Sequence, residues 1–171
     1  MVEELRSILI GTAGLSVAAV IALFLTLARG TIVASEPALA AAVRLAVAAV
    51  VVQAAHFAEE AATGFHQRFP ELLGVVPWSL RFFVLFNLVW LVVWALSIWG
   101  MMVRRRSALF ALWFLGLACM ANGLAHPLLA IRAGGYFPGL ATAPLVGILG
   151  VMLFRRLLRI TDAGAAPPNA A

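Results

Sequence analysis

The sequence predicts an all-α polytopic membrane protein, a bundle of about five transmembrane helices. Of its 171 residues, 64% are hydrophobic and only 11% are charged, and the mean hydropathy is +1.06. Soluble domains are about half apolar and about a quarter charged. The apolar residues also gather in long runs, and arginines stand at the ends of most of these runs. Lipid is therefore expected to be the solvent for much of the surface.

Five runs are long enough to cross a bilayer, because about 20 residues at 1.5 Å each span about 30 Å of hydrocarbon. They are residues 8–28, 39–62, 78–103, 109–131 and 140–158. We expect one transmembrane domain over residues 1–160. Residues 161–171 are rich in alanine, proline and glycine, a composition typical of a disordered C-terminal tail.

The first run, residues 8–28, has a signal peptide as its rival interpretation. Its apolar stretch is longer than the roughly 7–15 residues of a signal-peptide core. Glu3 and Glu4 also stand where such a peptide carries basic residues. We therefore expect a retained transmembrane helix, followed by a connection that contains Gly30 and Pro37.

The second run, residues 39–62, is rich in alanine and valine and carries polar residues near its far end. A connection over residues 64–77 follows it. The third run, residues 78–103, is rich in phenylalanine and tryptophan, which suit lipid contact and the membrane interface. The triplet at residues 104–106 ends this run with three consecutive arginines.

The fourth run, residues 109–131, leads into a connection over residues 132–139 that is rich in glycine. Glycine and proline are typical of turns, so we expect a break between two helices here. The fifth run, residues 140–158, is closed by Arg155, Arg156 and Arg159.

The arginine clusters predict the orientation of the protein in the cell membrane. Cytoplasmic connections carry an excess of basic residues. Five spans place the arginines at 104–106 and those at 155–159 on the same side, so both clusters can be cytoplasmic. We expect a multi-pass protein with its N-terminus outside and its C-terminus in the cytoplasm.

The sequence does not indicate a nucleic-acid partner, a disulfide or a soluble cofactor. The net charge is +5, but no interleaving of basic and aromatic residues outside the apolar runs indicates nucleic-acid binding. The single cysteine, Cys119, cannot form an internal disulfide. No phosphate-cradling glycine loop and no CxxC pair is present. The expected partners are the lipid bilayer and a lipophilic small molecule, and a homo-oligomer stays open.

The second run carries three ionisable residues, and such residues inside a membrane usually mark functional sites. On a helix, His56 and Glu60 are separated by about 40°, and Glu59 lies about 60° to the other side of His56. With Gln53 one turn earlier, they form one polar face that should turn away from lipid. The alternative is that this trio lies at the interface and is solvated.

The fourth run repeats this pattern, because Asn122 and His126 are four residues apart and share a face. Counting along the runs places His56, His126 and Asn87 at a comparable depth, in the outer half of the bilayer. We therefore expect three helices to direct polar side chains to one layer. The alternative is a set of hydrogen bonds between helices.

Imidazole and carboxylate groups suit a divalent transition metal such as zinc, iron or manganese. The same groups also suit proton transfer without a metal. The spacing does not separate these two chemistries. In either case the candidate residues, which would be catalytic and would also be the metal ligands, are His56, Glu59, Glu60 and His126.

The order of the motifs is similar to that of one family. Residues 56–60 read H-x-x-E-E, and Asn122 and His126 follow, then Y-F-P-G at residues 136–139 and Thr142. This order resembles the HxxEE-domain family of small bacterial integral membrane proteins over most of the chain. The resemblance implies a membrane protein and supports the site, but the family has no established activity.

We therefore predict a membrane-embedded enzyme, metal-dependent or acid–base and either a hydrolase or an isomerase/cyclase. It would act on a lipophilic substrate that enters laterally from the bilayer. Tyr136, in the loop above the polar layer, would cover the pocket. The expected substrate-binding residues are Asn87, Asn122 and Tyr136. The alternatives are a small cation or proton carrier, or an accessory membrane subunit, using the same polar cluster.

Overall fold

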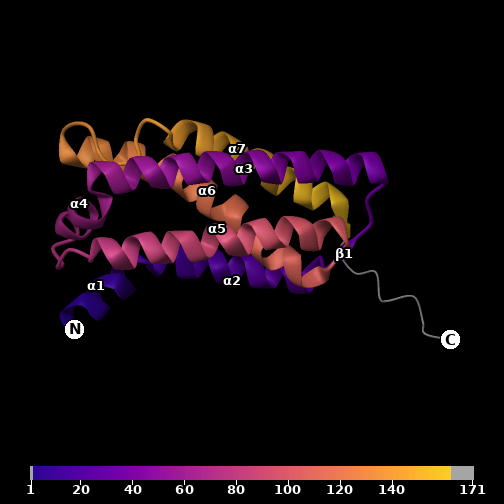
Figure 1. The fold of residues 1–171 in the computed structure, drawn as a ribbon, viewed down its shortest axis with the longest axis horizontal. Coiled ribbons are helices and arrows are strands. Elements are labelled where there is room, and N and C mark those ends of the chain that lie inside the picture. The colour runs from indigo at the N-terminus through magenta and orange to yellow at the C-terminus, as the bar shows by residue number, and fades with distance from the viewer. Residues whose placement is uncertain (1, 163–171) are drawn as a thin grey trace.

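The computed structural model describes residues 2–162 and is almost entirely helical, which confirms the all-α fold class. Its elements lie side by side in an elongated bundle (Figure 1). In the described residues the helices are α1 (Val2–Gly11), α2 (Ala13–Ala28), α3 (Glu36–Thr63), α4 (Phe65–Leu72), α5 (Leu80–Met102), α6 (Arg106–Ala133) and α7 (Ala143–Ile160). Two short strands, β1 (Thr31–Ile32) and β2 (Thr161–Asp162), pair antiparallel at one end.

The first apolar run is a broken helix, not the single helix expected over residues 8–28. Helices α1 and α2 meet at Thr12 with a bend of 54°. The bend brings Gly11 against the indole ring of Trp78, where an added Cβ would lie 2.9 Å from Trp78 Cη2. Ser7 fixes α1 in this position, because its hydroxyl donates to Val76 O at 2.6 Å and accepts from Trp78 Nε1 at 3.0 Å.

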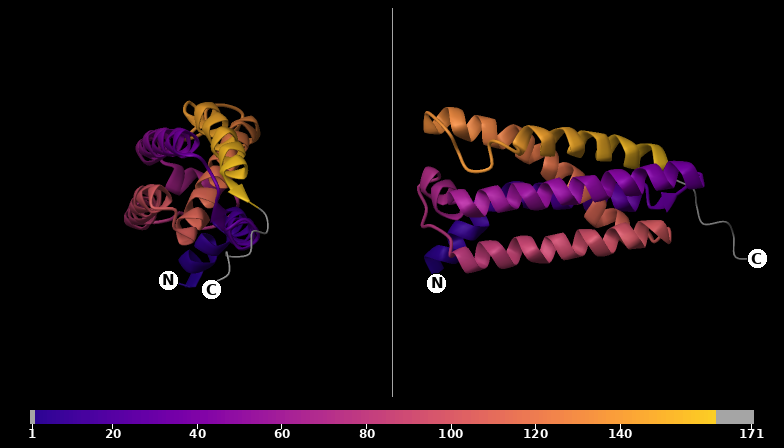
Figure 2. Two further views of the ribbon diagram at one scale, coloured as in Figure 1. Left: turned by 90° about the vertical axis from the view of Figure 1, so that its right-hand side faces the viewer. Right: turned by 45° about the horizontal axis from the view of Figure 1, so that its top comes forward.

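Helix α6 is the centre of the bundle. It crosses obliquely between the other helices (Figures 1 and 2) and packs against α2, α3, α5 and α7. Its N-terminal half is buried on almost every side, with Leu112, Trp113 and Leu115 fully enclosed. A helix that is apolar all round and enclosed by neighbours can hold polar side chains away from lipid. The buried polar side chain of α6, His126, is thus directed to other helices.

Helices α6 and α7 approach closely where two glycines face each other. A Cβ added to Gly123 would lie 2.5 Å from the Cα of Gly147, so neither position has room for a side chain. Small residues permit such close backbone contact between membrane helices. This contact fixes α7, and the loop before it, relative to α6.

Three helices, α3, α5 and α6, are long and apolar enough to cross a membrane, and the bent pair α1–α2 makes up to four. The expected count of about five spans is not confirmed. Helix α7 has Arg155, Arg156 and Arg159 in its last turns, so its uncharged part is residues 143–154. That part is shorter than the roughly 20 residues that span the hydrocarbon core.

The outer surface of α5 is compatible with a membrane location. Leu85, Val89, Val92 and Leu96 are each more than half exposed and follow one face of this helix. A contiguous exposed apolar face of this kind marks contact with lipid or with another protein. Its composition agrees with the aromatic and aliphatic lipid-facing helix that the sequence predicts.

Arginines hold together the end of the bundle where the strands pair. Arg29 donates to Leu158 O at 2.9 Å and also to Thr161 O, and Arg106 donates to Leu27 O at 2.9 Å. Leu158 O and Leu27 O lie in the last turns of α7 and α2, where carbonyl groups lack partners within their own helices. Thr161 and Asp162, which the sequence assigns to the tail, form β2. The rest of the predicted tail, residues 163–171, lies outside the described residues.

Candidate metal centre

Two histidines and one glutamate meet inside the bundle. His56 and Glu60 come from α3, and His126 comes from α6. One ligand atom from each residue lies within 4.8 Å of the other two. Glu60 Oε1 lies 3.5 Å from His56 Nε2 and 3.3 Å from His126 Nε2. All three side chains are buried, so they interact with one another and not with lipid.

The helical period explains why α3 presents this pair. Gln53, His56 and Glu60 follow one another at intervals of three and four residues and form the buried stripe of its last turns. His126 faces them from α6, and its ring meets the His56 ring edge-on with centroids 4.7 Å apart. The predicted convergence of these three residues is therefore seen in the structure.

The hydrogen bonds determine which nitrogen of His126 carries the proton. His126 Nδ1 lies 2.6 Å from Pro138 O. A backbone carbonyl can only accept a hydrogen bond, so the proton is on Nδ1. In the neutral ring the lone pair is then on Nε2, which is the atom that faces Glu60.

The same reasoning applies to His56. Its Nδ1 lies 2.7 Å from Thr142 Oγ1, and that hydroxyl donates its own proton to Glu59 Oε2 at 2.6 Å. Thr142 must then accept from His56 Nδ1–H. The lone pair of His56 is on Nε2, which is buried and has no hydrogen-bond partner within residues 2–162.

Three acceptors therefore face one another in a buried space: two imidazole lone pairs and one carboxylate. Such an arrangement needs a positive centre between its members, either a shared proton or a metal ion. Histidines that bind metals usually donate their second ring N–H to a carbonyl or to another fixed acceptor. Both His56 and His126 do so here.

The distances from Glu60 to the two histidines fit a first-row divalent ion. Ligands bonded at about 2.0–2.2 Å to a tetrahedral ion lie about 3.3–3.6 Å apart. The two histidine-to-Glu60 distances, 3.5 and 3.3 Å, agree with this spacing. A set of two histidines and one carboxylate is found in catalytic zinc sites and in non-haem iron sites, and both leave positions open for water or substrate.

Glu59, a predicted ligand, lies outside this cluster. Its Oε1 accepts from the Tyr136 hydroxyl at 2.6 Å and from the Ala141 amide at 2.9 Å. Its Oε2 accepts from the amide of Thr142 at 2.9 Å and from its hydroxyl. Neighbours in sequence on a helix point about 100° apart, so Glu60 turns inward and Glu59 turns to the loop. The carboxylate of Glu59 thus holds residues 136–142 in place.

The loop that Glu59 holds covers the two histidines. Gly139 has a φ of +87° and packs on the rings, because an added Cβ would lie 2.6 Å from His126 Nδ1 and 2.9 Å from His56 Cε1. Glycine is thus required twice, by the backbone conformation and by the space. Pro138 supplies the carbonyl that binds His126.

Tyr136 is about half exposed, and its hydroxyl binds Glu59. It is not among the residues that line the cavity described next. Desolvation, followed by the hydrogen bond to the Glu59 carboxylate, raises the pKa of the Tyr136 phenol above its ordinary value. The structure therefore places Tyr136 at the clamp of the loop, whereas the sequence suggested that it covers the pocket.

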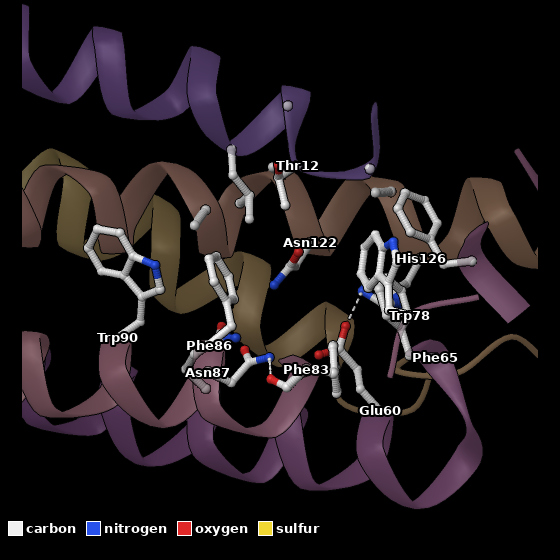
Figure 3. Close-up of a pocket in the computed structure, with 18 of the residues that line it drawn as sticks. Thr12, Glu60, Phe65, Trp78, Phe83, Phe86, Asn87, Trp90, Asn122 and His126 are labelled. Atoms are coloured by element: carbon white, nitrogen blue, oxygen red, sulfur yellow. Dashed lines mark hydrogen bonds and ion pairs between the residues drawn. The ribbon is translucent and has the colours of Figure 1, made fainter. Parts of the chain in front are cut away.

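A cavity of about 380 Å³ extends from the histidine–glutamate cluster along the bundle. Figure 3 shows Glu60 and His126 near one end, Asn87 and Asn122 near the middle and Trp90 at the other end. Its volume lies in the range of about 300–1,000 Å³ that is usual for small-molecule sites. Most of its wall is aromatic or aliphatic.

The predicted substrate-binding asparagines both line this cavity, and so does Gln53. Asn87 donates to Phe83 O at 2.9 Å, which leaves its carbonyl oxygen free. Gln53 Oε1 accepts only a weak bond from Cys119 Sγ at 3.4 Å. Asn122 has no hydrogen bond to another residue within the described chain. Three amides with unused hydrogen-bonding capacity thus face one space.

The sequence analysis did not assign roles to several residues of this site. Thr142 and Pro138 orient the histidines, and the Y-F-P-G element was the only signal for them. Phe65 and Phe69, which form the aromatic wall near the cluster together with Trp78 of the third run, come from a segment interpreted as a plain connection. That segment contains helix α4, whose eight residues gave no long periodic pattern.

One comparison with known proteins gave a match. The family described as "Protein of unknown function with HXXEE motif" matches residues 45–153. The match includes the whole candidate centre, from His56 to Thr142. No curated protein and no solved structure matches this chain.

Proposed function

This chain belongs to the family of proteins of unknown function with an HXXEE motif, and we propose that it is a membrane-embedded metalloenzyme acting on a lipophilic substrate. One observation carries the proposal. The Nε2 lone pairs of His56 and His126 converge with the Glu60 carboxylate at the end of an apolar cavity. The proposed cofactor is a divalent ion of zinc, iron or manganese.

The proposed ligands are His56, Glu60 and His126. A divalent ion in such a set supplies Lewis-acid chemistry and activates water. Glu60 and His126 both line the cavity, so the open coordination positions would face the substrate. Hydrolysis is the reaction class that this donor set supports most simply, because a divalent ion held by it would activate water.

Other residues of the site would position the substrate and keep the centre intact. The amides of Gln53, Asn87 and Asn122 would bind a polar group of the substrate. Glu59 is proposed as a positioning residue, since it holds the loop that covers the histidines and acts on His56 through Thr142. This division gives different roles to the two glutamates of the motif.

The lipophilic nature of the substrate follows from the surroundings of the centre. Aromatic side chains of α4 and α5 form much of the cavity wall, and the helices that carry the centre, α3 and α6, are apolar enough to span a membrane. We place the centre in the outer half of the bilayer, as the arginine distribution favours. A substrate dissolved in lipid would reach it without crossing water.

The experiment compares three samples of the full chain in detergent micelles with a membrane lipid extract: metal-loaded wild type, chelator-treated wild type and metal-loaded Glu60→Gln. Lipids are followed by mass spectrometry. We expect one lipid class to decrease and a product class to appear only with the first sample. Glu60→Gln is a matched control, because it keeps the side-chain shape and replaces the charged ligand by an amide.

Equal turnover in chelator-treated wild type would contradict a metal-dependent reaction and would indicate acid–base catalysis by the same residues. Unchanged lipids in all three samples would contradict an enzymatic function on membrane lipids. The carrier alternative would then be measured as metal or proton flux in proteoliposomes.

A further inference from the structure

We propose that the cavity binds a neutral single-chain lipid, with its polar head between the metal centre and the three amides and its chain along the aromatic walls of α5 and α6. This inference rests on the proposed function and names the substrate class of that site. It follows from the length of the cavity, the distribution of polar groups along it, the charges that line it and its position between two helices.

The cavity is long and narrow. On α6 its wall runs from Leu129 to Phe114, and on α5 it runs from Phe82 to Trp94. These stretches advance about 22 Å along α6 and about 18 Å along α5, at 1.5 Å per residue. A volume of about 380 Å³ spread over that length makes a narrow space, which suits one extended chain.

The amide and charged groups are confined to one part of this length, and among the described residues the far end offers only the indole N–H groups of Trp90 and Trp94. Asn122 is one turn from His126, about 6 Å along α6, and Gln53 is about 10 Å from Glu60 along α3. Beyond Asn122 the lining residues on α6 are Ala121, Ala118 and Phe114, and beyond Asn87 those on α5 are tryptophans. The ligand should therefore carry hydrogen-bonding groups over roughly 6–10 Å from the centre, followed by an apolar chain.

The side chains that line the cavity favour a neutral head over an anionic one. No arginine lines the cavity among the described residues, although the chain has twelve basic residues. Phosphate and carboxylate groups are usually recognised by arginine, by lysine or by clusters of backbone N–H groups. The unused groups here are neutral amides from three helices, which match hydroxyl, ester and amide groups. The head of a monoacylglycerol has this chemistry and this length.

The cavity lies between α2 and α5, and α6 forms its floor (Figure 3). Helices α2 and α5 each pack against α6, but within residues 2–162 they make no extensive contact with each other. The break between α1 and α2 adds Gly11, Thr12 and Gly14 to the rim, residues with small side chains. This gap is a lateral route along which a single chain can enter from the bilayer.

The test uses photoreactive, clickable lipid probes with the full chain in nanodiscs. The probes are a monoacylglycerol, a lysophosphatidic acid with the same acyl chain, and a diacyl phosphatidylcholine. We expect the monoacylglycerol to label α5 and α6 residues that line the cavity, and unlabelled monoacylglycerol to compete. Labelling of the cavity by the other two probes should be about tenfold weaker or less, equivalent to about 1.4 kcal/mol.

Two tryptophan variants separate the cavity from the general lipid surface. Ala121 is exposed and lines the cavity, so Ala121→Trp fills the space without displacing buried residues. Ala95 is an exposed alanine of α5 that does not line it. We expect Ala121→Trp to remove competable labelling and Ala95→Trp to leave it unchanged. Labelling of Ala121→Trp at the wild-type level would overturn the proposal.

Lysophosphatidic acid labelling the cavity as strongly as monoacylglycerol would overturn the neutral head. Equal labelling by phosphatidylcholine would overturn the single chain. The variant His56→Ala tests lipid binding separately from metal binding, because it removes a proposed metal ligand and leaves the cavity walls that bind the chain intact. If wild type contains no metal and labelling persists in His56→Ala, the metalloenzyme proposal is contradicted. The proposed lipid site is then still supported.

Discussion

Replacement of Thr142 by valine removes one hydroxyl from the site and keeps the shape of the side chain. In the wild type this hydroxyl accepts from His56 Nδ1 at 2.7 Å and donates to Glu59 Oε2 at 2.6 Å. Valine can do neither. The His56 ring then loses the contact that keeps its proton on Nδ1 and its lone pair directed to the centre.

The size of the effect follows from these contacts. Loss of an outer hydrogen bond to a metal-binding histidine lowers metal affinity about 10- to 100-fold. This factor corresponds to about 1.4–2.7 kcal/mol. A buried N–H left without an acceptor costs about 1–3 kcal/mol, which agrees with that range. The bonds from Tyr136 and Ala141 to Glu59 remain, so the loop should stay in place.

The assay is a competition titration of the purified protein against a chromogenic chelator, with zinc as the metal. We expect Thr142→Val to bind about 10- to 100-fold more weakly than wild type. Thr142→Ser keeps a hydroxyl and should bind within a few-fold of wild type. Equal affinities of Thr142→Val and wild type would refute the hydrogen-bond chain from Glu59 to His56. So would an equal loss in Thr142→Ser.

Three further predictions follow from the two glutamates and the loop. Glu60→Gln should abolish metal binding, whereas Glu59→Gln should keep it and increase hydrogen exchange in the loop; the reverse order would contradict their assigned roles. Gly139→Ala should lower stability by about 1–3 kcal/mol in thermal unfolding, since its Cβ would meet both histidines. Gly135→Ala should leave the stability unchanged, because the space around Gly135 is open. Because the chain has one tyrosine, an absorbance titration reports Tyr136 alone. Its midpoint should lie above the ordinary value of about 10, since desolvation and then Glu59 disfavour the phenolate. Any stabilisation from this group is present below that ordinary pKa and is lost as the pH rises through the higher folded value. Glu59→Gln should lower the midpoint, and a wild-type midpoint at or below 10 would refute this contact.

The helical fold and the meeting of His56, Glu60 and His126 could be predicted from the sequence. Long apolar runs indicate helices in lipid, and intervals of three and four residues place side chains on one face. The cost of polar groups in lipid then directs such faces toward other helices. The same reasoning brought Asn87 and Asn122 to the cavity, where the structure places them.

Other features could not be read from periodicity. Glu59 and Glu60 are adjacent, and their different roles depend on where α3 turns relative to a loop that is about 80 residues away in the chain. The break at Thr12 depends on the approach of Trp78 to Gly11, a contact between segments far apart in sequence. Helix α4 is too short to show a pattern that differs from a connection. Tertiary contacts decide all of these features.

The metal content of the purified full chain tests the central claim most directly. Elemental mass spectrometry would be applied to wild type, His56→Ala and His126→Ala, prepared in the same detergent and at the same loading. We expect close to one zinc, iron or manganese ion per wild-type chain and almost none in either variant, because the two histidines come from different helices and bind the same ion. Wild-type protein that is metal-free and cannot be loaded would contradict the metal centre. Metal that remains in both variants would also contradict it.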